Sequence, residues 1–159
     1  GHRSLAYLSG PETSWITARR WEALLEAAPR RGMSIVEIGP GLPTLEGGAA
    51  AMSRVAASGV TAVIAFNDLM AIGLMRAAVQ RGLTVPTDLS IAGFDDIFGS
   101  DFTTPGITTV RMPLADAGER VVRHLLGQVG RDPSSSGAES MALLPTDLVV
   151  RGSTGRSAS

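Results

Sequence analysis

The sequence contains no cysteine and no lysine, because all fourteen of its basic residues are arginine. Without cysteine the chain can have neither a disulfide framework nor a thiol nucleophile, and it fits a reducing compartment such as the cytoplasm. Without lysine it lacks the amine of a phosphate-binding loop or of a Schiff base. A formal net charge of −1 gives no basic stripe of the kind that nucleic-acid binding requires. We therefore do not expect this chain alone to bind DNA.

Long apolar runs are absent as well, and no stretch approaches the ~18 residues that a membrane span needs. The N-terminus has no charged segment followed by an apolar one, so we expect neither a signal peptide nor contact with a membrane. A length of 159 residues with 44% hydrophobic residues suits one globular core. The chain begins directly in a strand-like run, from which we expect it to be part of a longer polypeptide.

Strand-like and helix-like segments alternate through most of the chain. Short apolar runs rich in β-branched residues are separated by amphipathic segments that end at glycine or proline. Such alternation with short links predicts an α/β fold, a doubly wound parallel sheet with helices on both faces. The expected strands are 3–8, 33–38, 61–66, 89–94 and 143–150, with a short extended piece at 107–110, and the expected helices are 13–28, 46–58, 68–81 and 113–128.

Two polar residues follow neighbouring strands of this predicted sheet, Asn67 after the third and Asp95 after the fourth. The carboxyl edge of an open parallel sheet is where small ligands bind. A carboxylate, an amide and the planar fork of Arg20 together match a polyhydroxylated ligand, and Trp15 is a candidate platform for the apolar face of a sugar. The alternatives are a helix cap for Asn67, a turn former for Asp95 and a core or rim position for Trp15.

The sequence offers little evidence for an enzymatic function. No G-x-S-x-G elbow occurs, and His2 and His124 are too far apart in sequence to suggest a metal site or a Ser-His pair. The Gly39-Pro40-Gly41 loop lacks the third glycine of a dinucleotide fingerprint, which argues against a nucleotide-dependent enzyme. We expect a protein that is not an enzyme and that uses no metal and no cofactor, with Asp96 and Asp101 as solvated loop carboxylates.

Five segments of the sequence resemble, in order, those of one protein family. They are GHRSLAYLSGP (1–11), TAVIAFNDLMAIGLMRA (61–77), GLTVPTDLSIAGFDD (82–96), PGITTVRMP (105–113) and LPTDLVVRGST (144–154). On these segments the chain resembles the C-terminal part of a LacI/GalR-family transcriptional regulator. The resemblance implies a type I periplasmic-binding-protein-like core of two lobes, of which this chain supplies mainly the C-terminal lobe.

The resemblance also implies a division of the chain. Residues 1–109 and 141–153 would form the C-terminal lobe, the helix at 113–129 would belong to the N-terminal lobe of the intact protein, and 130–140 would be a loop. A helix-turn-helix DNA-binding domain, its hinge and most of the N-terminal lobe would lie upstream of this chain.

Family roles carry over to individual positions. Asn67 and Asp95 match positions that hydrogen-bond the effector, and Arg20, nine residues after Pro11, matches the effector-binding arginine. The aromatic residue that the family often has before the second helix is replaced by Leu42 and Pro43, which shifts ring stacking to Trp15. The family also forms homodimers, and the resemblance places Leu69, Ile72, Met75 and Phe102 in that interface.

The function expected from the resemblance is that of a cytoplasmic repressor whose small-molecule effector controls operator binding. The effector is a sugar, a related polyol or a purine, and DNA is reached only through the missing N-terminal domain. The alternative is a periplasmic sugar-binding protein of a transport system, which has the same fold and the same cleft chemistry. An upstream helix-turn-helix segment would favour the repressor, and an upstream secretion leader would favour the transport protein.

Overall fold

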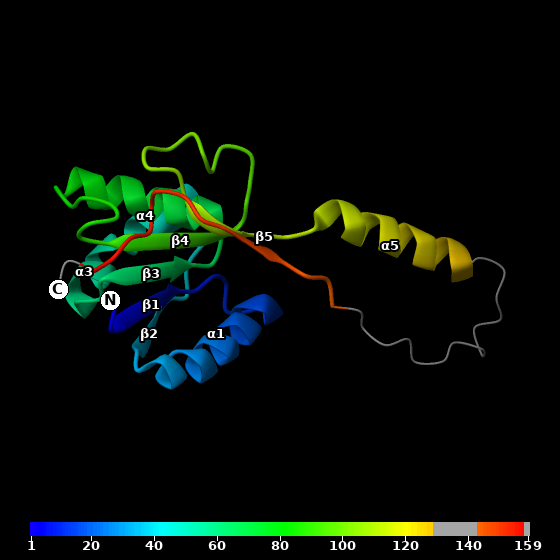
Figure 1. The fold of residues 1–159 in the computed structure, drawn as a ribbon, viewed down its shortest axis with the longest axis horizontal. Helices are drawn as coiled ribbons and strands as arrows, with labels where there is room; N and C mark the ends of the chain where they lie inside the picture. The colour runs from blue at the N-terminus through cyan, green and yellow to red at the C-terminus, as the bar shows by residue number, and fades with distance from the viewer. Residues whose placement is uncertain (129–142, 158–159) are drawn as a thin grey trace.

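A six-stranded sheet forms the centre of the molecule, in the order β2-β1-β3-β4-β5-β6. The computed structural model describes residues 1–128 and 143–157, so the predicted loop 130–140 lies outside the described residues (Figure 1). The first five strands pair in parallel, and β6 is antiparallel to β5. The predicted doubly wound α/β sheet is confirmed. The strands are β1 (Ser4–Leu8), β2 (Ser34–Ile38), β3 (Ala62–Ala65), β4 (Ser90–Asp95), β5 (Thr108–Arg111) and β6 (Asp147–Val149).

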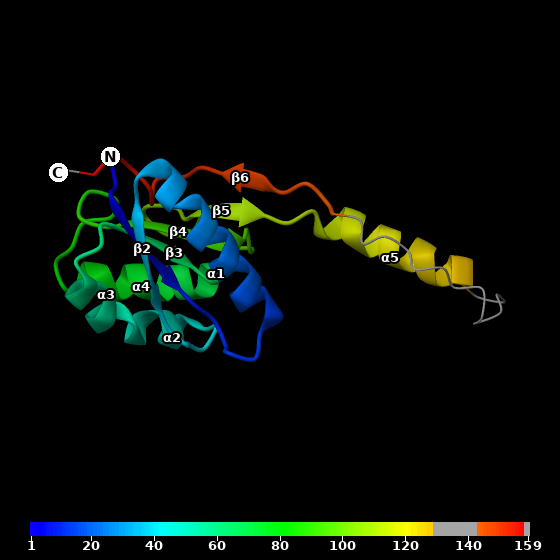
Figure 2. The same cartoon turned by 90° about the horizontal axis from the view of Figure 1, so that it is seen from below.

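Helices cover both faces of this sheet. Figure 1 shows α1 and α4 on opposite sides of the strands, with α2 beside α4 in Figure 2. The helices are α1 (Trp15–Ala27), the 3-10 turn η1 (Pro29–Arg31), α2 (Leu45–Ala50), α3 (Met52–Ser58), α4 (Asp68–Gln80) and α5 (Leu114–Gln128). No helix in the part of the chain that the structure describes is long and apolar enough to cross a membrane.

The strand order places a topological switch between β1 and β3. From β1 the chain crosses to β2 on one side and then returns to β3 on the other side of β1. In open parallel sheets the crevice at such a switch, outside the carboxyl ends of the strands, is the usual ligand site. Gly10 follows β1 there and packs directly against the Phe66 ring, so closely that a Cβ on Gly10 would overlap it.

One predicted helix, 46–58, is two helices in the structure. Thr44 begins α2, its side-chain oxygen accepting from Gly47 N at 3.1 Å, and the chain bends at Ala51 into α3. A Cβ on the buried Gly48 would overlap Met70 O, so α2 lies almost backbone to backbone on α4. This contact sets which residues face inward. The sequence period predicts Ala49, Met52 and Ala56 on the inward face. Met52 is buried as predicted, whereas Ala49 and Ala56 are exposed and Ala51 and Val55 are buried in their place.

The spacing of Trp21, Leu24, Leu25 and Ala28 predicts an apolar stripe on α1, and the structure buries only part of it. Ala28 is buried and Trp21 and Leu24 are half-buried, but Leu25 is 45% exposed. The Trp21 ring stacks on Tyr7 of β1, with ring centres 6.3 Å apart. Because α1 covers the β1–β2 end of the sheet, only one narrow side of the helix meets a strand.

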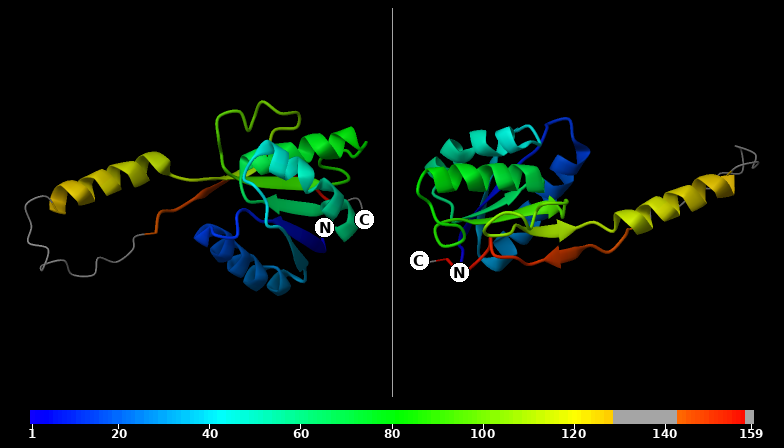
Figure 3. Two further views of the ribbon diagram at one scale, coloured as in Figure 1. Left: turned by 180° about the vertical axis from the view of Figure 1, so that it is seen from behind. Right: turned by 90° about the horizontal axis from the view of Figure 1, so that it is seen from above.

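Helix α5 projects away from the sheet, as the two views in Figure 3 show. Strands β5 and β6 lie side by side and lead to and from it (Figure 1). Its apolar side chains are more than half exposed: Leu114, Val121, Val122, Leu125 and Leu126. The assignment of 113–129 to another lobe stays a prediction, and the exposed apolar face is what that prediction requires.

Candidate functional site

Two of the predicted site residues, Arg20 and Asp95, meet at the carboxyl edge of the sheet. Arg20 Nη2 on α1 lies 3.9 Å from Asp95 Oδ1 at the end of β4. The guanidinium carbon of Arg20 also lies 3.8 Å from the centre of the Phe94 ring and 5.3 Å from that of Phe66. The Arg20 side chain is 16% exposed and that of Asp95 is 41% exposed. The pair is therefore open to a ligand on the aspartate side and covered by aromatic rings on the other.

The electrostatics of this pair reflect partial loss of water. Burial lowers the pKa of Arg20, and the nearby Tyr7 and Asp95 act in the opposite direction. Burial raises the pKa of Asp95, and the charge of Arg20 offsets part of that rise. A ligand hydroxyl between them would find a charged donor on one side and a charged acceptor on the other.

Asn67 has the role of a helix cap. Its Oδ1 accepts from Met70 N at 2.9 Å at the start of α4, and its Nδ2 donates to Pro43 O at 3.2 Å. The sequence analysis gave this helix cap as the alternative to a ligand-binding role for Asn67. The side chain also fixes the loop before α2, and its oxygen retains a second lone pair. Its link to the pair is indirect, because Arg20 Nη1 donates to the carbonyl of the preceding Phe66 at 2.5 Å.

Trp15 lies on the rim of an apolar hollow that it shares with Arg20. The hollow has a volume of about 400 Å³, and its lining includes Phe94, Val110 and Met112. Trp15 is 72% exposed, so it is a rim residue and not part of the core. The hollow extends from α1 to Met112, in the segment that leads from β5 to α5.

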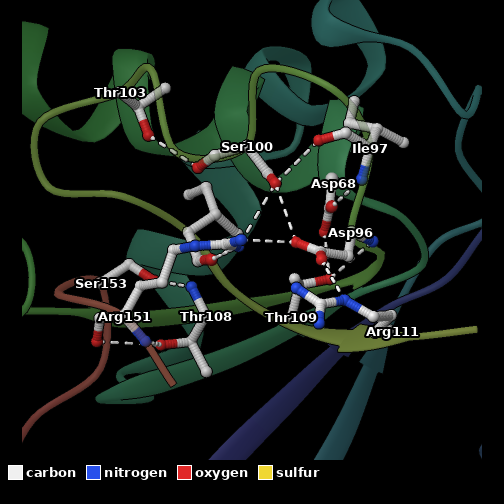
Figure 4. Close-up of polar contacts among 11 residues, drawn as sticks. Asp68, Asp96, Ile97, Ser100, Thr103, Thr108, Thr109, Arg111, Arg151 and Ser153 are labelled. Atoms are coloured by element: carbon white, nitrogen blue, oxygen red, sulfur yellow. Dashed lines mark hydrogen bonds and ion pairs between the residues drawn. The ribbon is translucent and has the colours of Figure 1, made fainter. Parts of the chain in front are cut away.

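Two further carboxylates, Asp68 and Asp96, are held by hydrogen bonds at the same edge of the sheet. Asp68 is fully buried, and its oxygens accept from Thr109 Oγ1 at 2.6 Å and from Ile97 N at 3.0 Å. The Asp96 side chain is only 9% exposed and pairs with Arg111 and Arg151, so the prediction of a solvated loop carboxylate is wrong for Asp96 (Figure 4). Asp101 is exposed, as predicted.

The pKa values of these two carboxyls move in opposite directions. Burial raises the pKa of Asp68, and the hydrogen bond from Thr109 offsets only part of that effect. Burial also acts to raise the pKa of Asp96, but the hydrogen bonds and charges of Arg151 and Arg111 outweigh it and leave the pKa below the ordinary value. No sequence signal pointed to this network, since the arginines lie fifteen and fifty-five positions from Asp96.

The histidine at the N-terminus lies away from this edge. His2 Nδ1 is 2.8 Å from Thr61 Oγ1 and its Nε2 is 3.1 Å from Ser90 Oγ, both at the amino ends of their strands. Among residues 1–128 and 143–157, no group of three His, Asp or Glu side chains is placed to hold a metal ion.

The four residues expected in a dimer interface divide into two kinds. Ile72 and Met75 are 6% and 3% exposed, while Leu69 and Phe102 are 36% and 69% exposed. Helix α4 lies between the sheet and α2, which accounts for much of its continuous apolar surface. Its free side, at Val79, borders a shallow hollow of about 390 Å³ that Phe102 also lines.

Comparison with known proteins assigns the chain to a family. A family model described as a periplasmic binding protein-like domain matches residues 1–154. The chain belongs to this family. The HTH-type transcriptional regulator reg1 of Streptomyces lividans is 39% identical over 161 residues, which covers 97% of this chain and 46% of that protein. The chain thus spans about half the length of this relative.

Solved structures with a similar fold agree with this family assignment. A LacI family transcriptional regulator from Enterococcus faecium with bound ribose superposes with a TM-score of 0.82 at 27% identity, covering 97% of this chain and 57% of that chain. A complex of the transcriptional regulator CelR with cellobiose superposes with a TM-score of 0.83 at 29% identity, covering 96% and 47%. The resemblance to the C-terminal part of LacI/GalR-family regulators is confirmed.

Proposed function

We propose that this chain is the greater part of the effector-binding domain of a cytoplasmic LacI/GalR-type repressor, and that its effector is a sugar or a related polyol. The effector would be bound without chemical change, and its binding would alter the affinity of a separate DNA-binding domain for its operator. The relatives are transcriptional regulators and not enzymes, which favours a binding function.

The observation that carries this proposal is the Arg20–Asp95 pair at the edge of the sheet. The two charged groups are 3.9 Å apart, partly buried, and backed by the Phe94 ring. Adjacent sugar hydroxyls can accept from the guanidinium and donate to the carboxylate, while the apolar face of the ring packs on an aromatic surface. Trp15 on the rim of the hollow supplies a second aromatic surface.

Helix α5 supports a two-lobed mechanism. It stands beyond the sheet with its apolar face exposed, and in the described part of the chain the strands β5 and β6 precede and follow it (Figure 2). A second lobe that covers this face would close over the Arg20–Asp95 pair. An effector that binds the closed form better than the open form shifts the equilibrium, with a coupling of roughly 1–3 kcal/mol in typical allosteric proteins.

Two alternatives differ in ligand or in setting. A purine could stack on Phe94 or Trp15 and use the same charged pair, so it remains the second ligand class. A periplasmic sugar-binding protein of a transport system would use the same cleft, but the relatives named above are regulators. We therefore keep the repressor as the proposed function.

A second copy of the chain is the partner that we propose for the exposed side of α4. Val79 is 54% exposed and Phe102 is 69% exposed, and the Phe102 ring packs edge-on against Phe98, which is 92% exposed. Apolar side chains gathered in this way on a surface are typical of a protein interface. Leu69, near the start of the same helix, is 36% exposed. Operator DNA would be reached only through the separate domain.

Thermal unfolding of the full-length regulator with added ribose, cellobiose or adenine tests the ligand class. A ligand that binds only the folded state raises the melting temperature by mass action. We expect a sugar to raise it, and we expect Arg20→Ala and Asp95→Ala each to reduce the rise strongly. Glu26→Gln, which removes an exposed ion pair on the same helix as Arg20, is the matched control and should retain it. An equal rise in both site variants would exclude this pair as the binding site.

A further inference from the structure

The backbone that carries Asp95 is in an unusual conformation. Asp95 has a φ of 100° and Asp96 a φ of 49°, and no other non-glycine residue in the described part of the chain has a positive φ. Aspartate enters the left-handed region more readily than most L-amino acids, but the φ of Asp95 lies beyond that region, and two positive values in succession persist only where surrounding contacts hold them. The end of β4 is therefore a turn that the local sequence does not favour by itself.

Two arginines hold the second of these residues. Arg111 Nε donates to Asp96 Oδ2 and Arg151 Nη2 donates to Asp96 Oδ1, each at 2.6 Å (Figure 4). The Arg151 side chain is 20% exposed and is fixed in turn, because its Nη1 donates to Ile107 O at 2.8 Å. Charge-assisted hydrogen bonds of this length are among the strongest in proteins, and this pair fixes the Asp96 carboxylate from two sides.

Hydrogen bonds to two buried side chains hold the backbone of the same turn. Asp96 N donates to Thr109 Oγ1 at 3.3 Å, and that hydroxyl donates to Asp68 Oδ1 at 2.6 Å. The other oxygen of Asp68 accepts from Ile97 N. Asp68 and Thr109 are both fully buried, and Gly93 makes room for this arrangement because a Cβ there would overlap Asp68 Oδ1.

We propose that Asp96 is a positioning residue, whose two arginine contacts hold the strained turn that presents the Asp95 carboxylate to the ligand beside Arg20. The inference rests on the proposed function in one respect, that Asp95 contacts the ligand. Asp96 itself pairs with Arg111 and Arg151, while Arg20 pairs with Asp95.

The two ion pairs of Asp96, which we call the Asp96 clamp, also link the turn to the segments that lead to α5. Arg111 is the last residue of β5, and Arg151 follows β6 by two positions. These strands are the connections to and from α5. A movement of those connections would therefore pull on Asp96, and through the turn it would alter how Asp95 is presented.

Hydrogen exchange of the Ile97 amide tests the positioning role without any ligand. Asp96→Ala removes both ion pairs and leaves an L-residue in the left-handed region, whereas Asp96→Gly removes the same ion pairs but relieves the strain. We expect exchange at Ile97, corrected for intrinsic rates, to be fastest in Asp96→Ala. It should be slower in Asp96→Gly by about 5- to 30-fold, the factor that corresponds to the cost of a left-handed L-residue.

The comparison of these two variants tests the backbone strain at residue 96, and their comparison with Glu26→Gln tests the arginine contacts. If the turn carried no strain, Asp96→Gly would exchange at least as fast as Asp96→Ala, because glycine is the more flexible residue. That order of rates, or rates in both variants equal to those of Glu26→Gln, would overturn the proposal.

The affinity of the full-length regulator for ribose and for cellobiose, measured by titration, tests whether Asp96 acts on ligand binding. We expect Asp96→Ala to weaken sugar binding about tenfold or more, Asp96→Gly to recover part of that loss, and Asp96→Ala to have no further effect once Asp95→Ala is present. Equal losses with and without Asp95 would contradict action through Asp95. If the unaltered protein binds neither sugar, the assignment of those sugars fails, and the Ile97 exchange rates alone decide the positioning role.

Discussion

The Arg20 guanidinium carbon lies 3.8 Å from the centre of the Phe94 ring, while its Nη1 donates a 2.5 Å hydrogen bond to Phe66 O. The side chain is therefore fixed from two adjacent strands, β3 and β4, before any ligand is present. A donor held in this way loses little conformational freedom on binding, which leaves more of its interaction energy for affinity. The free Nη2 is the one that faces Asp95.

Replacement of Arg20 by lysine is expected to weaken sugar binding roughly 10- to 100-fold, as expected for loss of a hydrogen bond that involves a charged group. Lysine keeps the positive charge, but it cannot donate to Phe66 and Asp95 in one plane or stack on Phe94. Isothermal titration calorimetry measures the affinity. Arg30→Lys, at an exposed ion pair just beyond the same helix, is the control, and an equal loss there would argue against a specific role for Arg20.

The Asp96 clamp predicts how stability depends on pH. The pKa of Asp96 in the folded state lies below its ordinary value of 3.8, so the clamp stabilises the fold above pH 3.8 and this contribution is lost as the pH falls through the folded-state pKa. Asp96→Asn should therefore lower the free energy of unfolding most at neutral pH, and the difference from the unaltered protein should shrink below pH 3.8.

Urea unfolding across this pH range makes the measurement. Asp68, whose pKa is raised by burial, contributes with the opposite sign, because its stabilising effect is present at low pH and declines as the pH rises. A difference between Asp96→Asn and the unaltered protein that does not change with pH would contradict the depressed pKa of Asp96.

Gly73→Ala should destabilise the fold by about 1–3 kcal/mol, the usual cost of overpacking a core. A Cβ at Gly73 would overlap Leu45 O, so α2 would have to move away from α4. This shift outweighs the gain in helix propensity of alanine over glycine. Urea unfolding checks the value, and Ala49→Ser on the exposed side of α2 should change stability by no more than about 0.5 kcal/mol. A stabilised Gly73→Ala variant would show that the two helices can separate without cost.

Phe102→Asp and Val79→Asp are each expected to convert a dimer into a monomer at micromolar concentration. A carboxylate at either position would be buried without a partner in the proposed interface, which is strongly unfavourable. Light scattering after size exclusion gives the mass. Leu25→Asp alters an apolar residue of similar exposure on α1 and should remain dimeric. A monomeric unaltered protein, or a dimer that survives both substitutions, would place the interface elsewhere.

The fold followed from the sequence more fully than the site did. The spacing of apolar residues and the glycines and prolines between them predicted the five parallel strands and most of the helices, because these patterns depend on residues close together in the sequence. They did not predict the break at Ala51, which arises where α2 packs on Met70 of α4. Nor could they show that β6 runs antiparallel, since that depends on the excursion through α5.

For the site, the sequence predicted that Arg20 and Asp95 would meet, through strand ends and the family resemblance, and the geometry agrees. It left two readings for Asn67, and the hydrogen bonds show that the helix cap is formed. The binding role of Asn67 remains a prediction. Sequence reasoning misplaced Asp96, because a turn residue with no local partner is normally solvated.

What the sequence determined by itself was the alternation of elements and the polar residues at the strand ends, since both depend on contacts within one turn or one strand. What only the tertiary structure decided was the state of each carboxylate. Asp95 stays open to solvent, while Asp96 is enclosed by Arg111 and Arg151. The two residues are adjacent in the chain, but the charges that distinguish them come from distant strands, and only folding brings those charges close enough to act.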